Sequence, residues 1–237
     1  MKVHQKTVIV VLTEYNFIDN VAPIIDLLVE NDYKVILIET NYTYNYKNDN
    51  NLIYLHSKHK NIVSLKLYES ILGFKIKNFT KIEKKLNRHV DGNFSDTICV
   101  IDHSSGDDNK ANNYLKKIIM QHNIKCIAFN HGLEITTNVL VSIYNLTFNI
   151  EKDKNLTFAQ KNALKLVVYN EQNKKGQSEY ISKKYNDKIV VLPTLRYSSY
   201  WLSEIQKSYA KFEFETTKLK LVYLNSSENL MGGPRKI

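Results

Sequence analysis

Six short runs of apolar residues, many of them β-branched, recur along the chain and constrain its fold more than any other feature. The runs are TVIVVL at 7–12, KVILI at 34–38, TICVI at 97–101, KCIAF at 125–129, KLVVY at 165–169 and KIVVL at 188–192. Each is too short for a buried helix and does not alternate with polar residues, so each predicts a strand buried on both faces of a parallel sheet. Strand, helix, strand units of this kind are right-handed and parallel. The sequence therefore predicts an α/β fold, a Rossmann-like open parallel sheet with helices on both faces.

The first connection predicts a helix. Apolar side chains repeat at helical spacing over residues 18–29, with Pro23 expected in the first turn and Asn16 or Asp19 as the cap. This unit places a helix directly after the first strand, as the fold requires.

Other connections are less regular. We expect a short third strand at 52–55, a helix over 61–72, and amphipathic helices over 171–185 and 200–209. The polar stretch at 41–51 has two interpretations, a surface loop or a loop that faces an acceptor, and the surface loop is the simpler one.

The loop after the first strand, residues 13–17, contains no glycine. Dinucleotide sites use a glycine pattern there so that the backbone can approach the pyrophosphate. Neither that pattern nor a P-loop occurs in the sequence. We therefore expect a Rossmann-like topology without a cofactor.

Composition is that of a soluble globular protein, with 237 residues, 43% hydrophobic and 24% charged, which argues against a wholly disordered chain. No apolar run reaches the roughly 18 residues that cross a bilayer, and we expect a cytoplasmic protein. Cys99 and Cys126 fall inside predicted strands, where a thiol packs as a small hydrophobe, so we expect no metal site.

The formal net charge is +9, from 33 basic and 24 acidic residues. This favours an anionic partner: a nucleotide, a phospholipid surface or nucleic acid. Because the positive charge is mostly lysine spread along the chain, without a recognisable reading module, nucleic acid ranks last of the three.

A predicted helix over residues 75–90 concentrates part of this charge. Its apolar side chains mark one face, while the face bearing Lys81, Lys84, Lys85 and Arg88 is basic. Such a helix can lie on an anionic membrane surface, here the inner face of the cell membrane. The alternative is an ordinary surface helix packed on the sheet with solvated lysines.

The strongest candidate for chemistry follows the strand at 125–129, where Asn130, His131 and Gly132 end the apolar run. In open parallel sheets, ligands bind beyond the carboxyl ends of the strands. Gly132 lets the backbone approach a ligand, and the imidazole of His131 can transfer a proton near neutral pH. The alternative is a histidine that only hydrogen-bonds its loop.

Two further strand ends carry polar residues. Asp102, His103 and Ser104 follow the strand at 97–101, and Arg196 and Tyr197 come after the strand at 188–192. Parallel strands bring such ends to one edge of the sheet. We therefore expect these residues to bind substrate beside His131.

The chain resembles a bacterial surface-polysaccharide glycosyltransferase of the GT-B class in three respects taken together. These are the order of its elements, His131-Gly132 after the central strand, and the later motif KIVVLPTLRYSSYW. The likeness is to the amino-terminal half of such enzymes, near CDP-glycerol glycerophosphotransferases and lipopolysaccharide or capsule transferases. It spans about residues 7–224. The chain departs from the family pattern at Leu133-Glu134, often Thr-Pro there, and at Pro193 and Leu195 in the later motif.

The resemblance implies that residues 1–217 form the acceptor-side domain, and that 218–237, with its LKLVYL run and Gly232-Gly233-Pro234, begin a truncated second domain or a tail. The implied activity is transfer of a sugar or polyol phosphate from a nucleotide-activated donor to a glycan or lipid-linked acceptor. The donor would be held by a second domain or a partner, so the chain as given is expected to be catalytically incomplete.

Two other classes of function remain open from the sequence. One is a stand-alone nucleotide or small-ligand binding domain of flavodoxin-like topology, without catalysis. The other is an interaction module that docks on anionic membrane through the basic helix.

Overall fold

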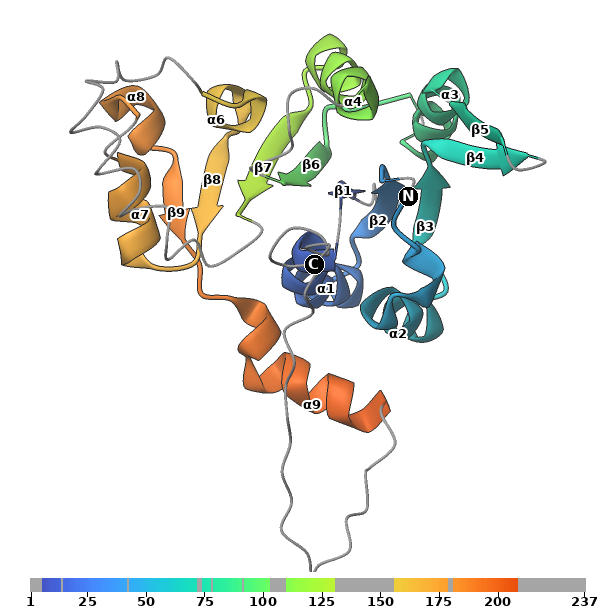
Figure 1. The fold of residues 1–237 in the computed structure, drawn as a ribbon, viewed down its shortest axis with the longest axis horizontal. Coiled ribbons are helices and arrows are strands. Elements are labelled where there is room, and N and C mark those ends of the chain that lie inside the picture. Colours follow the sequence, from blue (N-terminus) through green and yellow to red (C-terminus); the bar gives the residue numbers. More distant parts are fainter. Residues whose placement is uncertain are drawn as a thin grey trace, which may run out of the picture.

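Seven parallel strands form one sheet in the computed structural model (Figure 1). The structure describes residues 6–13, 15–41, 43–71, 74–77, 79–90, 92–102, 110–130, 156–178 and 181–208. The strands are β1 (Thr7–Leu12), β2 (Lys34–Glu39), β3 (Val63–Lys66), β6 (Thr97–Asp102), β7 (Lys125–Phe129), β8 (Lys165–Val168) and β9 (Ile189–Val191). All six predicted strands are present, with ends shifted by at most one residue.

The strands lie in the order β3-β2-β1-β6-β7-β8-β9, so the direction of winding reverses between β1 and β6. The first three strands run outward on one side of this point and the later four on the other, which is the Rossmann order. The α/β fold prediction is confirmed. The flavodoxin-like alternative is wrong in topology, because that fold places its first strand between the second and third.

Alternate residues of the central strands feed two cores. Val8 and Val10 face one core, while Ile9 and Val11 face the other, and all four are buried. In register, Ile9 lies between Ile36 of β2 and Cys99 of β6. A strand buried on both faces needs continuous apolar sequence, which explains why the runs do not alternate.

Helices cover both faces (Figure 1). On one face are α1 (Tyr15–Glu30), α2 (Asn50–Lys58) and α9 (Ser199–Ser208), and on the other are α3 (Phe79–His89), α4 (Lys110–Gln121) and α6 (Phe158–Asn162). The smaller elements are η1 (Tyr46–Asn48), α7 (Glu171–Ser178), α8 (Lys183–Asn186), η2 (Leu195–Tyr197) and the antiparallel hairpin of β4 (Tyr68–Ile71) and β5 (Phe74–Lys77). After β9 the chain crosses beneath the sheet, where α9 reaches α1 and α2.

The expected third strand at 52–55 is wrong, because these residues belong to α2. The Asp49 side chain caps that helix by accepting a hydrogen bond from the Leu52 amide at 3.0 Å. The third strand is β3, inside the segment expected to be helical, and it pairs with β2 through Ile36 and Val63. A short edge strand with exposed polar positions carries little of the apolar signal.

Three helix predictions need correction. Pro23 lies in the third turn of α1, where the burial of neighbours such as Ile25 offsets its missing hydrogen bond, and neither Asn16 nor Asp19 is the cap because both lie inside the helix. The expected helix over 75–90 begins only at Phe79, because β5 takes the preceding residues. The expected helix over 171–185 is divided into α7 and α8, and Ile181 between them is buried in the core.

Candidate functional site at the carboxyl edge of the sheet

The reversal between β1 and β6 creates the position where open α/β sheets bind ligands. Thr13 follows β1, and its hydroxyl donates a hydrogen bond to Asp102 Oδ2 at 3.1 Å. Asp102 is the last residue of β6 and is 2% exposed. The two strands at the reversal are thus joined at their carboxyl ends through a buried carboxylate.

Asn130 comes directly after β7, the neighbour of β6, and is 0% exposed. Its backbone is satisfied: the amide donates to the Val167 carbonyl at 3.1 Å, and the carbonyl accepts from the Tyr169 hydroxyl. Its side-chain Oδ1 and Nδ2 are buried and have no hydrogen-bond partner within the described part of the chain. An unpaired buried amide costs about 1 to 3 kcal/mol, so a group that reached this side chain and could both donate and accept would stabilise it.

Tyr169 links Asn130 to the charged residues of the edge. Burial raises the pKa of its hydroxyl, Asp102 raises it further and Arg196 opposes the rise. The phenol is therefore a neutral donor at physiological pH.

Arg196 is held in place by α1. It lies in η2, and its Nη1 donates to Asp19 Oδ2 at 2.7 Å, with the side chains 18% and 24% exposed. Its Cζ lies 4.7 Å from the centroid of the Tyr197 ring. The structure therefore brings three predicted site residues, Asp102, Asn130 and Arg196, to the carboxyl edge, with Tyr197 exposed beside them.

The loop between β2 and α2 folds over the same edge. Tyr46 is buried, and its hydroxyl donates to the Leu12 carbonyl at the end of β1 at 2.9 Å. The hydroxyl of Tyr44 donates to Asp49 Oδ2 at 2.5 Å. Burial raises the pKa of the Tyr44 hydroxyl, and the hydrogen bond to Asp49 raises it further. These contacts place Tyr46 at the carboxyl end of β1, and the interpretation of residues 41–51 as a loop that faces an acceptor stays a prediction.

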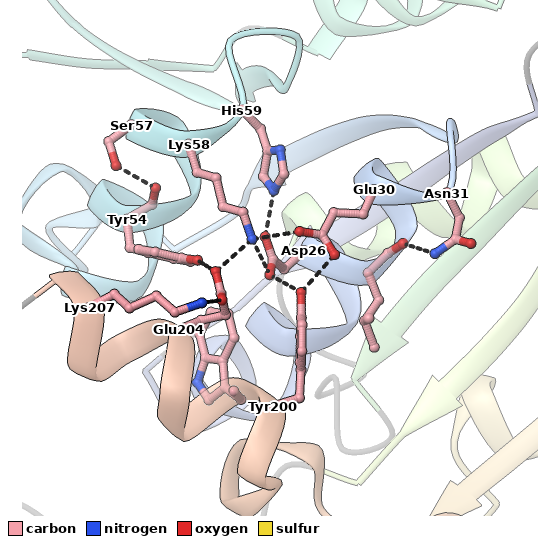
Figure 2. A network of polar contacts seen from close by, with 12 residues as sticks. Asp26, Glu30, Asn31, Tyr54, Ser57, Lys58, His59, Tyr200, Glu204 and Lys207 are labelled. Atoms are coloured by element: carbon pink, nitrogen blue, oxygen red, sulfur yellow. Dashed lines mark hydrogen bonds and ion pairs between the residues drawn. The ribbon is translucent and has the colours of Figure 1, made fainter.

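A polar network holds α9 on α1 and α2, and through α9 it supports η2 (Figure 2). At its centre is Asp26, whose side chain is fully buried. Asp26 Oδ1 accepts from His59 Nε2 at 2.5 Å, and Oδ2 accepts from Lys58 Nζ at 3.0 Å and from the Tyr200 hydroxyl at 2.5 Å. Two of these partners come from the end of α2 and one from α9, so one carboxylate joins three helices.

A second carboxylate extends this network. Glu204 Oε2 on α9 accepts from the Tyr54 hydroxyl at 2.8 Å and from Lys58 Nζ at 2.9 Å. Trp201 is 2% exposed and packs edge to face on Tyr54, with ring centroids 5.4 Å apart. The sequence does not predict these partners as a group, because they come from three distant segments.

Four candidates lie outside the described residues: His103, Ser104, His131 and Gly132. So do residues 218–237. The sequence did not predict three residues that belong to the carboxyl edge of the sheet: Asp19, Tyr15 and Tyr169. Only Tyr169 carried a usable signal, as the last residue of a predicted strand.

The basic helix is present as α3. Lys81, Lys84, Lys85 and Arg88 are exposed, while Ile82 and Leu86 are buried against the sheet. This arrangement confirms a surface helix packed on the sheet, and docking of its basic face on a membrane stays a prediction.

Within the described ranges, no group of three or more histidine, cysteine, aspartate or glutamate side chains could hold a metal ion. Likewise, none of the described helices is long and apolar enough to cross a membrane. Cys99 and Cys126 are buried register partners on β6 and β7. A hydrogen bond with Cys126, together with burial, raises the pKa of the Cys99 thiol, which disfavours the reactive thiolate.

Comparison with known proteins finds distant structural likenesses. No protein-family model and no curated protein sequence matches the chain. Among solved structures, TcCGT1 in complex with UDP is similar at 13% identity and a TM-score of 0.36, over 62% of this chain and 33% of that one. UGT89C1 of Arabidopsis thaliana, complexed with UDP-L-rhamnose, is similar at 14% identity and a TM-score of 0.42, over 81% of this chain and 50% of that one. The chain thus spans between a third and a half of the length of these proteins.

Proposed function

We propose that the chain is the acceptor-side domain of a GT-B glycosyltransferase of bacterial surface-polysaccharide synthesis, of the lipopolysaccharide or capsule kind. The observation that carries this proposal is the buried, unpartnered amide of Asn130, one strand from Asp102 at the ligand-binding edge of a Rossmann-like sheet. A hydroxyl of a glycan both donates and accepts, so it can complete this amide. The sequence resemblance supports the same class.

The proposed reaction transfers a sugar or polyol phosphate from a nucleotide-activated donor to a glycan or lipid-linked acceptor. The acceptor hydroxyl loses its proton to His131, and its oxygen forms the new bond to the donor. The nucleotide leaves with the electron pair of the broken bond. His131 suits the role of base because an imidazole titrates near neutral pH. It also follows Asn130 directly in sequence.

The remaining predicted residues take binding roles in this proposal. Asp102 orients the acceptor, and Gly132 lets the backbone approach it. Further contacts come from His103, Ser104, Arg196 and Tyr197.

The donor requires a second wall. A transferase must hold donor and acceptor in line and exclude water, and one sheet edge supplies one side of such a cleft. We assign the donor to a second domain or a partner. The basic face of α3 would hold the domain at the inner face of the membrane, close to a lipid-linked acceptor.

The test replaces the gene, in the cells that make the protein, with variants carrying His131→Ala or Asn130→Ala. Both should remove one sugar or polyol from the surface polysaccharide and raise the cytosolic pool of the matching nucleotide-activated donor. Met120→Ala, an exposed change at the end of α4, is the control and should leave both unchanged. Unaltered polysaccharide and donor pools in both site variants, with normal protein levels, would contradict the proposed function.

A further inference from the structure

Two tyrosines stand exposed at the carboxyl edge. Tyr15 in the first turn of α1 is 55% exposed, and Tyr197 in η2 is 63% exposed. Asp19, burial and Tyr197 all raise the pKa of the Tyr15 hydroxyl, and Arg196 opposes them. Tyr15 lies one helical turn before Asp19 on α1. Asp19 binds Arg196, the residue next to Tyr197, so both rings lie beside this ion pair.

The Tyr197 ring is held from one side. The guanidinium of Arg196 lies 4.7 Å from its centroid, and Asp19 Oδ2 fixes that guanidinium at 2.7 Å. A stacked guanidinium covers one face of a ring, so the exposure of Tyr197 belongs largely to the other face and the ring edge. A fixed aromatic ring with an open face is a stacking surface at low entropic cost.

Local charge decides which ligand this surface favours. The whole chain carries a net charge of +9, yet the guanidinium beside the Tyr197 ring is held by the Asp19 carboxylate, and a second carboxylate, Asp49, also raises the pKa of the Tyr15 hydroxyl. Tyr169 deeper in the edge is acted on by Asp102, Asp19 and the same guanidinium. Since Arg196 is already paired with Asp19, a phosphate here would meet net negative charge, whereas a neutral hydroxyl can donate to a carboxylate.

We infer that Tyr15 and Tyr197 form a subsite for a neutral saccharide ring. The apolar C–H face of the sugar stacks on the open face of Tyr197, and its hydroxyls donate to Asp19, whose side chain is 24% exposed. This inference rests on the proposed function. It narrows the acceptor, at this position, to an uncharged sugar and excludes a phosphorylated sugar or polyol.

The test is saturation-transfer NMR on the 237-residue chain. The probes are methyl glycosides of glucose, galactose, mannose, rhamnose and N-acetylglucosamine, each paired with a phosphate of the same sugar. We expect saturation of at least one neutral glycoside and a weaker effect on its phosphate. Tyr197→Ala should weaken binding about threefold to tenfold, in line with the strength of aromatic contacts.

Two controls separate stacking from misfolding. Tyr197→Phe keeps the ring and should retain binding, and Met120→Ala, equally exposed but at the end of α4, should bind as the wild type does. Three results would overturn the inference: binding unchanged in Tyr197→Ala, no saturation of any glycoside, or stronger saturation of the phosphates that is lost in Arg196→Gln. The third result would leave the proposed function standing with an anionic acceptor, whereas failure of that function appears as unaltered surface polysaccharide in the cell experiment.

Discussion

Arg196 Nη1 donates to Asp19 Oδ2 at 2.7 Å, and this contact joins residues 177 positions apart at the carboxyl edge of the sheet. It fixes η2, which follows the last strand, to α1, which follows the first. An ion pair therefore joins α1 and η2, which are far apart in the sequence, at the candidate site.

The first prediction concerns the strength of this pair. A double-mutant cycle of Arg196→Ala and Asp19→Ala, followed by urea unfolding, should give a coupling energy of about 1 kcal/mol, because both side chains are mostly buried and the bond is charge-assisted. Arg196→Lys should recover only part of it, since an ammonium cannot reproduce the planar stack on Tyr197. Additive single variants would mean that the pair does not form in solution.

The second prediction concerns Asp26. Asp26→Ala leaves Lys58, His59 and Tyr200 without their shared acceptor and should lower the free energy of unfolding by about 3 to 5 kcal/mol. Trp201 lies on α9, is the single tryptophan of the sequence and is buried, so its fluorescence should shift to the red as α9 loosens.

Glu30 provides the matched control for Asp26, because it pairs with the same Lys58 at 2.7 Å but its side chain is 38% exposed. Glu30→Ala should cost less than about 1 kcal/mol. Equal losses from the two variants would show that Asp26 is not the centre of the network.

Much of the fold, and less of the site, was predictable from sequence. Strands buried on both faces have continuous apolar sequences, so the ends of β1, β2, β6 and β7 were predicted to within one residue. The edge strand β3 lacks that signal, and it was missed because only Val63 and Leu65 of its four residues are apolar. The apolar run at 52–55 is compatible with a strand or a helix, and the Asp49 cap stabilises the helix.

The site divides in the same way. Asp102 and Asn130 were predictable because the rule of parallel strand ends needs only local sequence. Asp19 reaches the edge through Arg196, and Tyr200 reaches Asp26, only when α1, η2 and α9 pack together. Such contacts between distant segments leave no local pattern.

The third prediction is a pH dependence. Hydrogen bonds from Lys207, Lys58 and Tyr54 lower the pKa of Glu204 to about 2, below its ordinary value of 4.5. Since the folded state binds this proton less readily, the stabilisation is fully present above about pH 4.5 and is lost as the pH falls towards 2. The difference in urea midpoint between wild type and Glu204→Gln should therefore be constant from pH 7 to 5 and shrink below 4.5. A difference that grows on acidification would contradict these contacts.

The fourth prediction concerns α3. At low salt, sedimentation with vesicles rich in anionic lipid should retain the wild type, because each basic side chain contributes about 1 kcal/mol near such a surface. Changing all four basic residues of the face to glutamine should abolish retention. A control that removes equal charge elsewhere should retain it, by changing the exposed Lys117, Lys125, Lys165 and Lys183 to glutamine. Retention that is indifferent to anionic lipid, or lost equally in both variants, would leave α3 as an ordinary surface helix.

The most direct measurement of the central claim is nucleotide binding by the purified chain, because an acceptor-side domain and a stand-alone nucleotide-binding domain differ in this property. Titration calorimetry with UDP, CDP, GDP and their sugar conjugates should show dissociation constants above about 1 mM, which corresponds to a binding free energy weaker than about −4.1 kcal/mol. Donor consumption should also stay at the rate of the buffer. Micromolar nucleotide binding, or donor turnover that His131→Ala abolishes, would contradict the account by showing that a donor site is folded into these 237 residues.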